Sequence, residues 1–115
     1  MIDLHLHTTA SDGYYSPEQL VDRAFLAGLK VISITDHDTV AATESIKQLA
    51  EARGLLAISG TEITAVDHNQ DIHMLGYFLD HQDEALEDFL ADQREYRITR
   101  IKIIADRLSE LDLPI

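Results

Sequence analysis

Apolar and polar positions alternate along the chain with two different periods. Short apolar segments predict strands, the first two of them buried, at residues 2–7, 31–35, 55–64 and 72–79. The polar stretch 65–71 between the last two predicts a hairpin loop. Segments 16–28 and 41–54 carry apolar residues at helical spacing and predict helices between the strands. Strands and helices in this order are typical of a parallel α/β sheet or of part of a barrel.

The predicted helices carry signals at their ends. The helix at 16–28 has an N-cap, a first-turn proline, a capping box and a terminal glycine, at Ser16, Pro17, Gln19 and Gly28. The helix at 41–54 stops at Gly54. A third helical pattern, interrupted at most once, runs from Asp83 to Asp112. Its apolar side consists of Leu86, Phe89, Leu90, Ile101, Ile104, Leu108 and Leu111.

Composition limits the classes of function. The chain has 115 residues, enough for one domain, with 9 basic and 21 acidic residues and a formal charge of −12. That balance argues against a nucleic-acid binder that relies on basic surface, although bound divalent cations would draw phosphate to the protein. Without cysteine, any metal site must use histidines and carboxylates. No membrane-spanning segment or secretory signal is visible, so we expect a cytoplasmic protein.

Histidines gather at the predicted ends of the strands. His5 and His7 share one face of the first strand, because alternate side chains of a strand point the same way. His37 follows the second strand directly, and α/β folds collect ligands beyond the carboxyl ends of their strands. Chance placement of these three imidazoles is improbable, and they predict a metal site. Zn, Mn or Fe suit such ligands, and neighbouring carboxylates favour more than one ion.

Several other polar residues leave alternatives open. Asp12 is either a ligand or a turn cap before Gly13, and Glu62 is either a ligand or a plain carboxylate at the end of the third strand. The spacing of His73 favours neither a ligand nor a structural role.

The remaining acidic and histidine positions favour other roles. We expect Asp36 and Asp38 to support the ligands by hydrogen bonds or to cap helices, and not to bind the metal themselves. His68 and His81 fall in polar loops, where exposure to solvent is expected.

Four motifs in order along the chain, DLHLHTTASDG, ISITDHDT, GTEIT and HMLGYF, resemble the first motifs of the polymerase and histidinol phosphatase (PHP) superfamily. They are most similar to its small phosphoesterases, which act on nucleotides and on RNA ends. The resemblance implies a distorted (β/α)7 barrel with two or three divalent ions, whether Mn, Zn, Fe or Mg. By motif position it implies that the ligands are His5, His7, Asp12, His37, Glu62 and His73. Glu62 would bridge two ions and would act in catalysis together with His37.

The same resemblance divides the chain into two parts. Residues 1–80 would form the N-terminal part of the metal-binding barrel, and residues 81–115 the helical start of an inserted subdomain. The family completes its site with His and Asp ligands from later strands, whereas no histidine follows His81 here. Three parallel strands with a hairpin arm also do not close a barrel. We therefore expect either the first part of a longer enzyme or self-association through an open sheet edge.

The resemblance implies hydrolysis of phosphate esters of nucleotides or oligonucleotides, and the ligand set fits such hydrolysis by a metal-activated water. Arg94, Arg97 and Arg100 follow a three-residue spacing, which either presents a cationic face to phosphate or forms a solvated helix face. Two other interpretations stay open. One is an amidohydrolase-like metal hydrolase, which also uses an early His-x-His strand. The other is a non-catalytic metal-binding PHP module of the kind attached to DNA polymerases.

Overall fold

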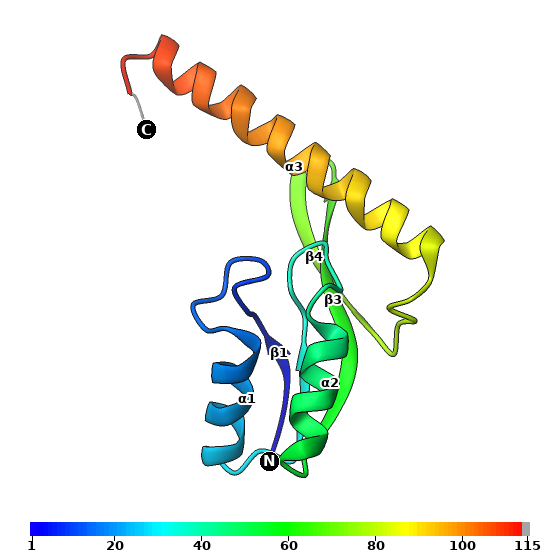
Figure 1. The fold of residues 1–115 in the computed structure, drawn as a ribbon. Helices are drawn as coiled ribbons and strands as arrows, with labels where there is room; N and C mark the ends of the chain where they lie inside the picture. The colour runs from blue at the N-terminus through cyan, green and yellow to red at the C-terminus, as the bar shows by residue number, and fades with distance from the viewer. Residues whose placement is uncertain (114–115) are drawn as a thin grey trace.

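In the computed structural model, which describes residues 1–113, strands and helices follow one another in the predicted order (Figure 1). The strands are β1 (Ile2–Leu6), β2 (Val31–Ile34), β3 (Leu56–Asp67) and β4 (Gln70–Tyr77). The helices are α1 (Pro17–Leu26), α2 (Thr43–Ala52) and α3 (Glu84–Glu110). The strands form one four-stranded sheet in the order β1-β2-β3-β4. No helix among the described residues is both long enough and apolar enough to cross a membrane.

The long strand β3 pairs with one neighbour in parallel and with the other antiparallel. Its first part pairs in parallel with β2, which also pairs in parallel with β1. From Gly60 to Asp67 it pairs antiparallel with β4. In Figure 1 this hairpin extends past the ends of β1 and β2 towards α3, which crosses it. The predicted α/β class, with parallel strands and a hairpin arm, is confirmed, and the carboxyl ends of the parallel strands meet below α3.

The core lies between the parallel strands and the two shorter helices. Its buried apolar residues are Leu20, Val21, Ala24, Leu29, Ile32, Ile34, Ala42, Ile46, Ala50 and Leu55. Ser16 and Gln19 form the predicted capping box, in which the Gln19 N–H donates to Ser16 Oγ at 3.3 Å. Both helices are followed by glycines in the left-handed region, with φ of 77° at Gly28 and 71° at Gly54. Local signals in the sequence therefore set both ends of α1 and the C-terminal end of α2, whereas α2 begins after Ala42 without a side-chain cap.

Two loop predictions are wrong. The predicted loop 65–71 is mostly strand, and only His68 and Asn69 form the turn, with φ of 47° and 64°. A two-residue hairpin turn of type I′ has positive φ at both positions, which Asn and His adopt more readily than most residues. His68 is exposed as predicted, but the His81 side chain is only 16% exposed, because its Nε2 lies 2.9 Å from Glu44 Oε2.

The exposure of the apolar residues also differs from the prediction. β1 is an edge strand, not a buried one, and Ile2 is 62% exposed because only β2 pairs with β1 in the described part of the chain. Helix α3 is unbroken, and of its predicted apolar side only Leu90 is fully buried. Ile101 and Ile104 are 61% and 47% exposed. The described residues thus leave apolar surface on β1 and α3 uncovered.

The 115-residue chain is expected to self-associate through this surface, because open strand edges and exposed apolar area drive association. Light scattering should give a mass above the 12.9 kDa of the monomer, rising with concentration. Replacing Ile2 and Leu4 with lysine puts charge on the β1 edge and should lower that mass. A monodisperse monomer at every concentration would contradict the expectation.

Candidate metal centre

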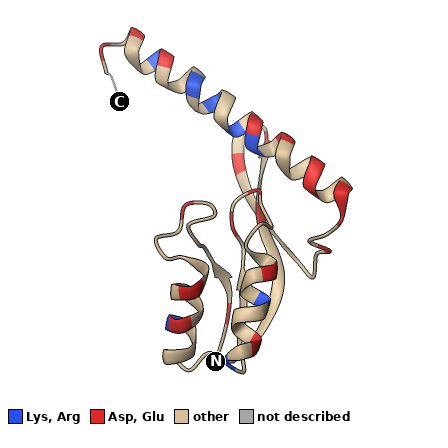
Figure 2. Ribbon diagram, in the orientation of Figure 1, with Lys and Arg blue, Asp and Glu red and all other residues tan. Residues whose placement is uncertain are grey.

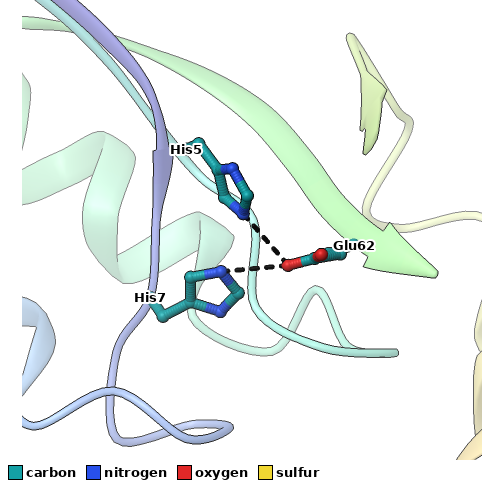
Figure 3. A group of neighbouring side chains, drawn as sticks. All are labelled: His5, His7 and Glu62. Atoms are coloured by element: carbon teal, nitrogen blue, oxygen red, sulfur yellow. Dashed lines mark hydrogen bonds and ion pairs between the residues drawn. The ribbon is translucent and has the colours of Figure 1, made fainter. Parts of the chain in front are cut away.

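Glu62 lies at the centre of a group of imidazoles (Figure 3). Its Oε2 is 3.1 Å from Nε2 of His5 and 3.0 Å from Nε2 of His7. The same oxygen is 3.7 Å from Nε2 of His37, while Oε1 is 2.8 Å from Nδ1 of His73. The Glu62 side chain is 4% exposed, against 50% for His5 and His73. One buried carboxylate therefore contacts imidazoles from three separate strand regions.

The main chain around Glu62 explains this convergence. The Glu62 N–H donates to the carbonyl oxygen of Asp36 at 3.1 Å, and the Glu62 carbonyl accepts from the Asp38 N–H at 2.9 Å. These two bonds bracket His37 and hold it beside Glu62. His73 lies opposite the residue two positions after Glu62, so both side chains lie on the same face of the hairpin.

Asp12 reaches the group from the loop between β1 and α1. Its Oδ1 is 3.2 Å from Nδ1 of His7, and its Oδ2 is 3.4 Å from Nε2 of His37. The loop is tight, and a Cβ at Gly13 would lie 2.3 Å from the carbonyl oxygen of His7. Only glycine fits there, and this close approach directs the neighbouring Asp12 towards the imidazoles.

The buried carboxylate of Asp36 anchors the same loop. It accepts hydrogen bonds from the Thr8 N–H at 2.7 Å, the Thr8 hydroxyl at 2.6 Å and the Ser11 hydroxyl at 2.7 Å. Asp36 thus links the end of β2 to the loop that carries Asp12. Thr8 and Ser11 were not singled out in the sequence, because short hydroxyl residues in a loop have no distinguishing spacing.

Three overlapping groups of side chains have the spacing of metal ligands: His5–His7–Glu62, His7–Asp12–His37 and His37–Glu62–His73. Within each group, one potential ligand atom per residue lies within 4.8 Å of the others. Nδ1 of His37 is buried and has no hydrogen-bond partner among the described residues, although buried polar atoms are normally paired. Nδ1 of His7 is also buried and makes no hydrogen bond, although Asp12 Oδ1 lies 3.2 Å away. Crowded nitrogen and carboxylate donors of this kind fit divalent ions such as Zn, Mn or Fe.

Local electrostatics favour the protonation states that bind metal. Burial lowers the pKa of the His37 imidazole, although the charges of Glu62 and Asp12 act in the opposite direction. For Glu62, burial acts to raise the pKa, but hydrogen bonds from His5 and His73 and the charge of His37 outweigh it, and its pKa lies below the usual value. A neutral imidazole and an ionised carboxylate result, and these are the forms that coordinate cations.

The three predicted arginines lie on α3 and are all paired with acidic residues. Nη1 of Arg97 donates to Oδ2 of Asp38 at 3.0 Å, and Nη1 of Arg94 donates to the Asp38 carbonyl oxygen at 2.9 Å. Nη1 of Arg100 donates to Oδ1 of Asp71 at 2.7 Å. Figure 2 shows the cations grouped in the middle and later turns of α3, after the acidic first turns. Nη2 of Arg94 also donates to Oε1 of Glu87, an acidic residue earlier on α3, at 2.7 Å. The arginine side chains are 38%, 39% and 43% exposed, so a cationic face for phosphate and a solvated face balanced by acids both stay open.

Two cavities lie on either side of Arg97. The larger, of about 410 Å³, is bordered by the polar residues Ser11, Asp12, His37, Arg94 and Arg97. The smaller, of about 270 Å³, is bordered by the polar residues Thr64, Asp71, His73, Arg97 and Arg100. Both join the imidazole group to the arginines of α3. Asp71 was missed in the sequence because its position next to the site depends on the hairpin pairing that the predicted loop concealed.

Curated relatives are similar to this chain over most of its length. The chain is 44% identical over 114 residues to the 5'-3' exoribonuclease Rnm of Salmonella typhimurium, covering 97% of this chain and 39% of that protein. It is 31% identical over 101 residues to the 3',5'-nucleoside bisphosphate phosphatase of Chromobacterium violaceum, covering 88% of this chain and 35% of that protein. The chain therefore spans well under half the length of these relatives.

Solved structures share the fold. A putative metal-dependent phosphoesterase from Bifidobacterium adolescentis aligns with a TM-score of 0.84 and 39% identity, over 95% of this chain and 38% of that one. An amidohydrolase from Chromobacterium violaceum, with bound sulfate and no metal, aligns with a TM-score of 0.89 and 28% identity, over 99% of this chain and 40% of that one. The described sheet and helices thus correspond to part of a larger fold in both proteins.

The family assignment agrees with the sequence motifs and with the fold. Residues 3–105 match the model of the PHP domain, which covers all of the strands from Asp3 onwards and most of α3. The predicted family is confirmed: the chain belongs to the PHP domain family.

Proposed function

We propose that this chain is part of a metal-dependent phosphoesterase that hydrolyses phosphate esters of nucleotides or oligonucleotides. The observation that carries the proposal is the position of Glu62, whose two carboxylate oxygens face different imidazoles in a buried site. Glu62 would then be the ligand shared by two ions. The full set of proposed ligands is His5, His7, Asp12, His37, Glu62 and His73.

The chain's own part in the reaction is to hold ligands and to receive the phosphate. A divalent ion, when bound, supplies a coordinated water of lowered pKa and neutralises charge on phosphate oxygens. Glu62 and His37, which are 4% and 11% exposed, keep their ligand atoms away from bulk water. Arg94 and Arg97 border the cavity beside Asp12 and place guanidinium groups where an anionic ester would enter. In the complete reaction they orient the ester and balance its charge.

The relatives support a phosphate ester of a nucleotide or of RNA as the substrate. The Salmonella relative is named an exoribonuclease, and the Chromobacterium relative is named a nucleoside bisphosphate phosphatase. Both names describe phosphate ester chemistry on nucleotide substrates, and the Bifidobacterium structure is described as a putative metal-dependent phosphoesterase. Residues 81–115 would then be the start of a helical subdomain that covers the site, as the crossing of α3 over the hairpin suggests.

Amide hydrolysis is a second candidate, because one similar structure is described as an amidohydrolase. Imidazoles and carboxylates around divalent ions serve both reactions, since each needs a metal-activated water. The arginines beside the cavity favour the phosphoesterase, because a neutral amide offers them no anionic group.

A chimeric enzyme tests the proposal, because this chain spans 39% of the Salmonella relative. In the chimera, this chain replaces the matching segment of that exoribonuclease. With Mn²⁺, we expect it to hydrolyse a 5'-phosphorylated oligoribonucleotide and a nucleoside bisphosphate, and to lose both activities in EDTA. The 115-residue chain, assayed beside it with p-nitrophenyl phosphate, should be far slower. Faster cleavage of an aryl amide than of any phosphate ester would favour the amidohydrolase, and a folded, metal-loaded chimera without turnover would favour a non-catalytic module.

A further inference from the structure

Two arginines of helix α3 bond to Asp38, the residue that follows His37 at the end of β2. Arg94 and Arg97, one helical turn apart, both donate to it: Arg94 to the carbonyl oxygen at 2.9 Å and Arg97 to Oδ2 at 3.0 Å. The Asp38 side chain is 1% exposed, whereas that of Arg97 is 39% exposed. A carboxylate as deeply buried as that of Asp38 needs a partner, and Arg97 is that partner. Arg94, which is also paired with Glu87 at 2.7 Å, holds the main chain of Asp38.

Asp38 has an unusual backbone. Its φ is 51°, in the left-handed region that non-glycine residues seldom adopt, and it directly follows His37. Its N–H donates to the Glu62 carbonyl at 2.9 Å, which holds the chain in that conformation. A strained residue next to a proposed ligand persists only where its surroundings fix it, and here those surroundings are Glu62 on one side and the two arginines on the other.

Asp38 itself belongs to none of the three ligand groups among the described residues. Its Oδ2 is engaged by Arg97, and its Oδ1 is buried without a hydrogen-bond partner. His37, by contrast, belongs to two of the three groups, those with Asp12 and with His73. A shift of the Asp38 backbone would therefore move one imidazole that both groups share, while the group of His5, His7 and Glu62 would keep its own ligands.

We propose that Arg94 and Arg97 position His37 through Asp38, so that the docking of α3 controls metal affinity in the two ligand groups that contain His37. The inference rests on the proposed metal centre. Asp38 and the two arginines are positioning residues in this role, acting on the ligand geometry and not on the metal directly. The contacts with Asp38 join α3 to the end of β2, although the two segments lie far apart in the sequence.

The test is titration of the purified chain with Mn²⁺, which needs no substrate. Asp38→Asn keeps the size of the side chain but removes its charge, and Arg97→Gln removes the same ion pair from the half-exposed side. Both variants should retain the tightest ion and lose at least tenfold in the affinity of the next one. Asp22→Asn is the matched control, because it removes an exposed Asp–Arg ion pair between α1 and the end of α2. That control should bind Mn²⁺ as the parent does.

The imidazole resonances of the metal-free chain give a second, independent measurement. In both variants the ring signals of His37 should shift, while those of His81, which is paired with Glu44, should not. Unchanged Mn²⁺ affinities together with an unchanged His37 signal would overturn the inference. A parent chain that binds no Mn²⁺ would overturn the metal centre, and the His37 signal alone would then decide whether the arginines position the imidazole.

Discussion

Glu62→Gln in the chimeric enzyme is expected to lower the rate of phosphate ester hydrolysis by about a thousandfold or more, equivalent to about 4 kcal/mol of lost transition-state stabilisation. Glutamine keeps the size of the side chain but replaces one carboxylate oxygen with an NH₂ group, which donates hydrogen bonds and does not bind cations. In the parent chain one oxygen of Glu62 faces His5 and His7, and the other faces His73. A side chain with one ligand oxygen can no longer serve both sides.

The loss of stability should be smaller than the loss of activity. Glu62→Gln weakens the contacts with His5, His7 and His73, which should cost about 1.5–3 kcal/mol, the usual contribution of a hydrogen bond to a charged group. Burial already opposes ionisation of Glu62, so the neutral amide recovers part of its desolvation cost. Initial rates and urea unfolding in EDTA measure the two losses separately.

A matched substitution outside the group controls for the chemistry of the change. Glu44→Gln removes another carboxylate that contacts an imidazole, with Oε2 of Glu44 2.9 Å from Nε2 of His81, and it should leave the rate unchanged. If Glu62→Gln lost stability and activity in proportion, Glu62 would be a structural residue at the end of the first part of β3.

The elements that the sequence predicted correctly are those with local signals. Ser16 and Gln19 cap α1 by contacts within a single turn, and Gly28 ends the helix through its own φ. The loop of the hairpin was predicted too long, because the polar residues around His68 and Asn69 are equally compatible with a loop and with strands that have solvent on both faces. The exposure of β1 depends on which strands lie beside it, and no local pattern contains that information.

In the candidate site too, some contacts could be predicted from local patterns in the sequence and others could not. His5 and His7 are two residues apart on a strand, and His37 follows a strand end, so the strand period and the parallel topology were enough to bring them together. The contact between Arg97 and Asp38 joins residues that are 59 positions apart, on elements that share no hydrophobic period. Such a contact follows from how α3 packs over the strand ends, and only the structure reveals it.

Replacing both His5 and His7 with alanine is expected to abolish tight binding of divalent ions by the 115-residue chain. The two imidazoles lie 3.1 Å and 3.0 Å from the same Glu62 oxygen, and together they take part in two of the three ligand groups. Only the group of His37, Glu62 and His73 remains intact. Loss of a residue that merely supports a ligand costs about 10–100-fold in metal affinity, so loss of two ligands should cost more than about a thousandfold.

Calorimetric titration with Zn²⁺ or Mn²⁺ measures this loss, with circular dichroism to confirm that each variant is folded. The control His68→Asn with His81→Ala removes two imidazoles outside the group, and asparagine suits the positive φ at position 68. The single variants add a graded test: His7→Ala should weaken binding more than His5→Ala, because His7 belongs to two ligand groups and His5 to one. Unchanged metal content in the double variant would refute the ligand assignment, because among the described residues two of the three ligand groups would have lost members.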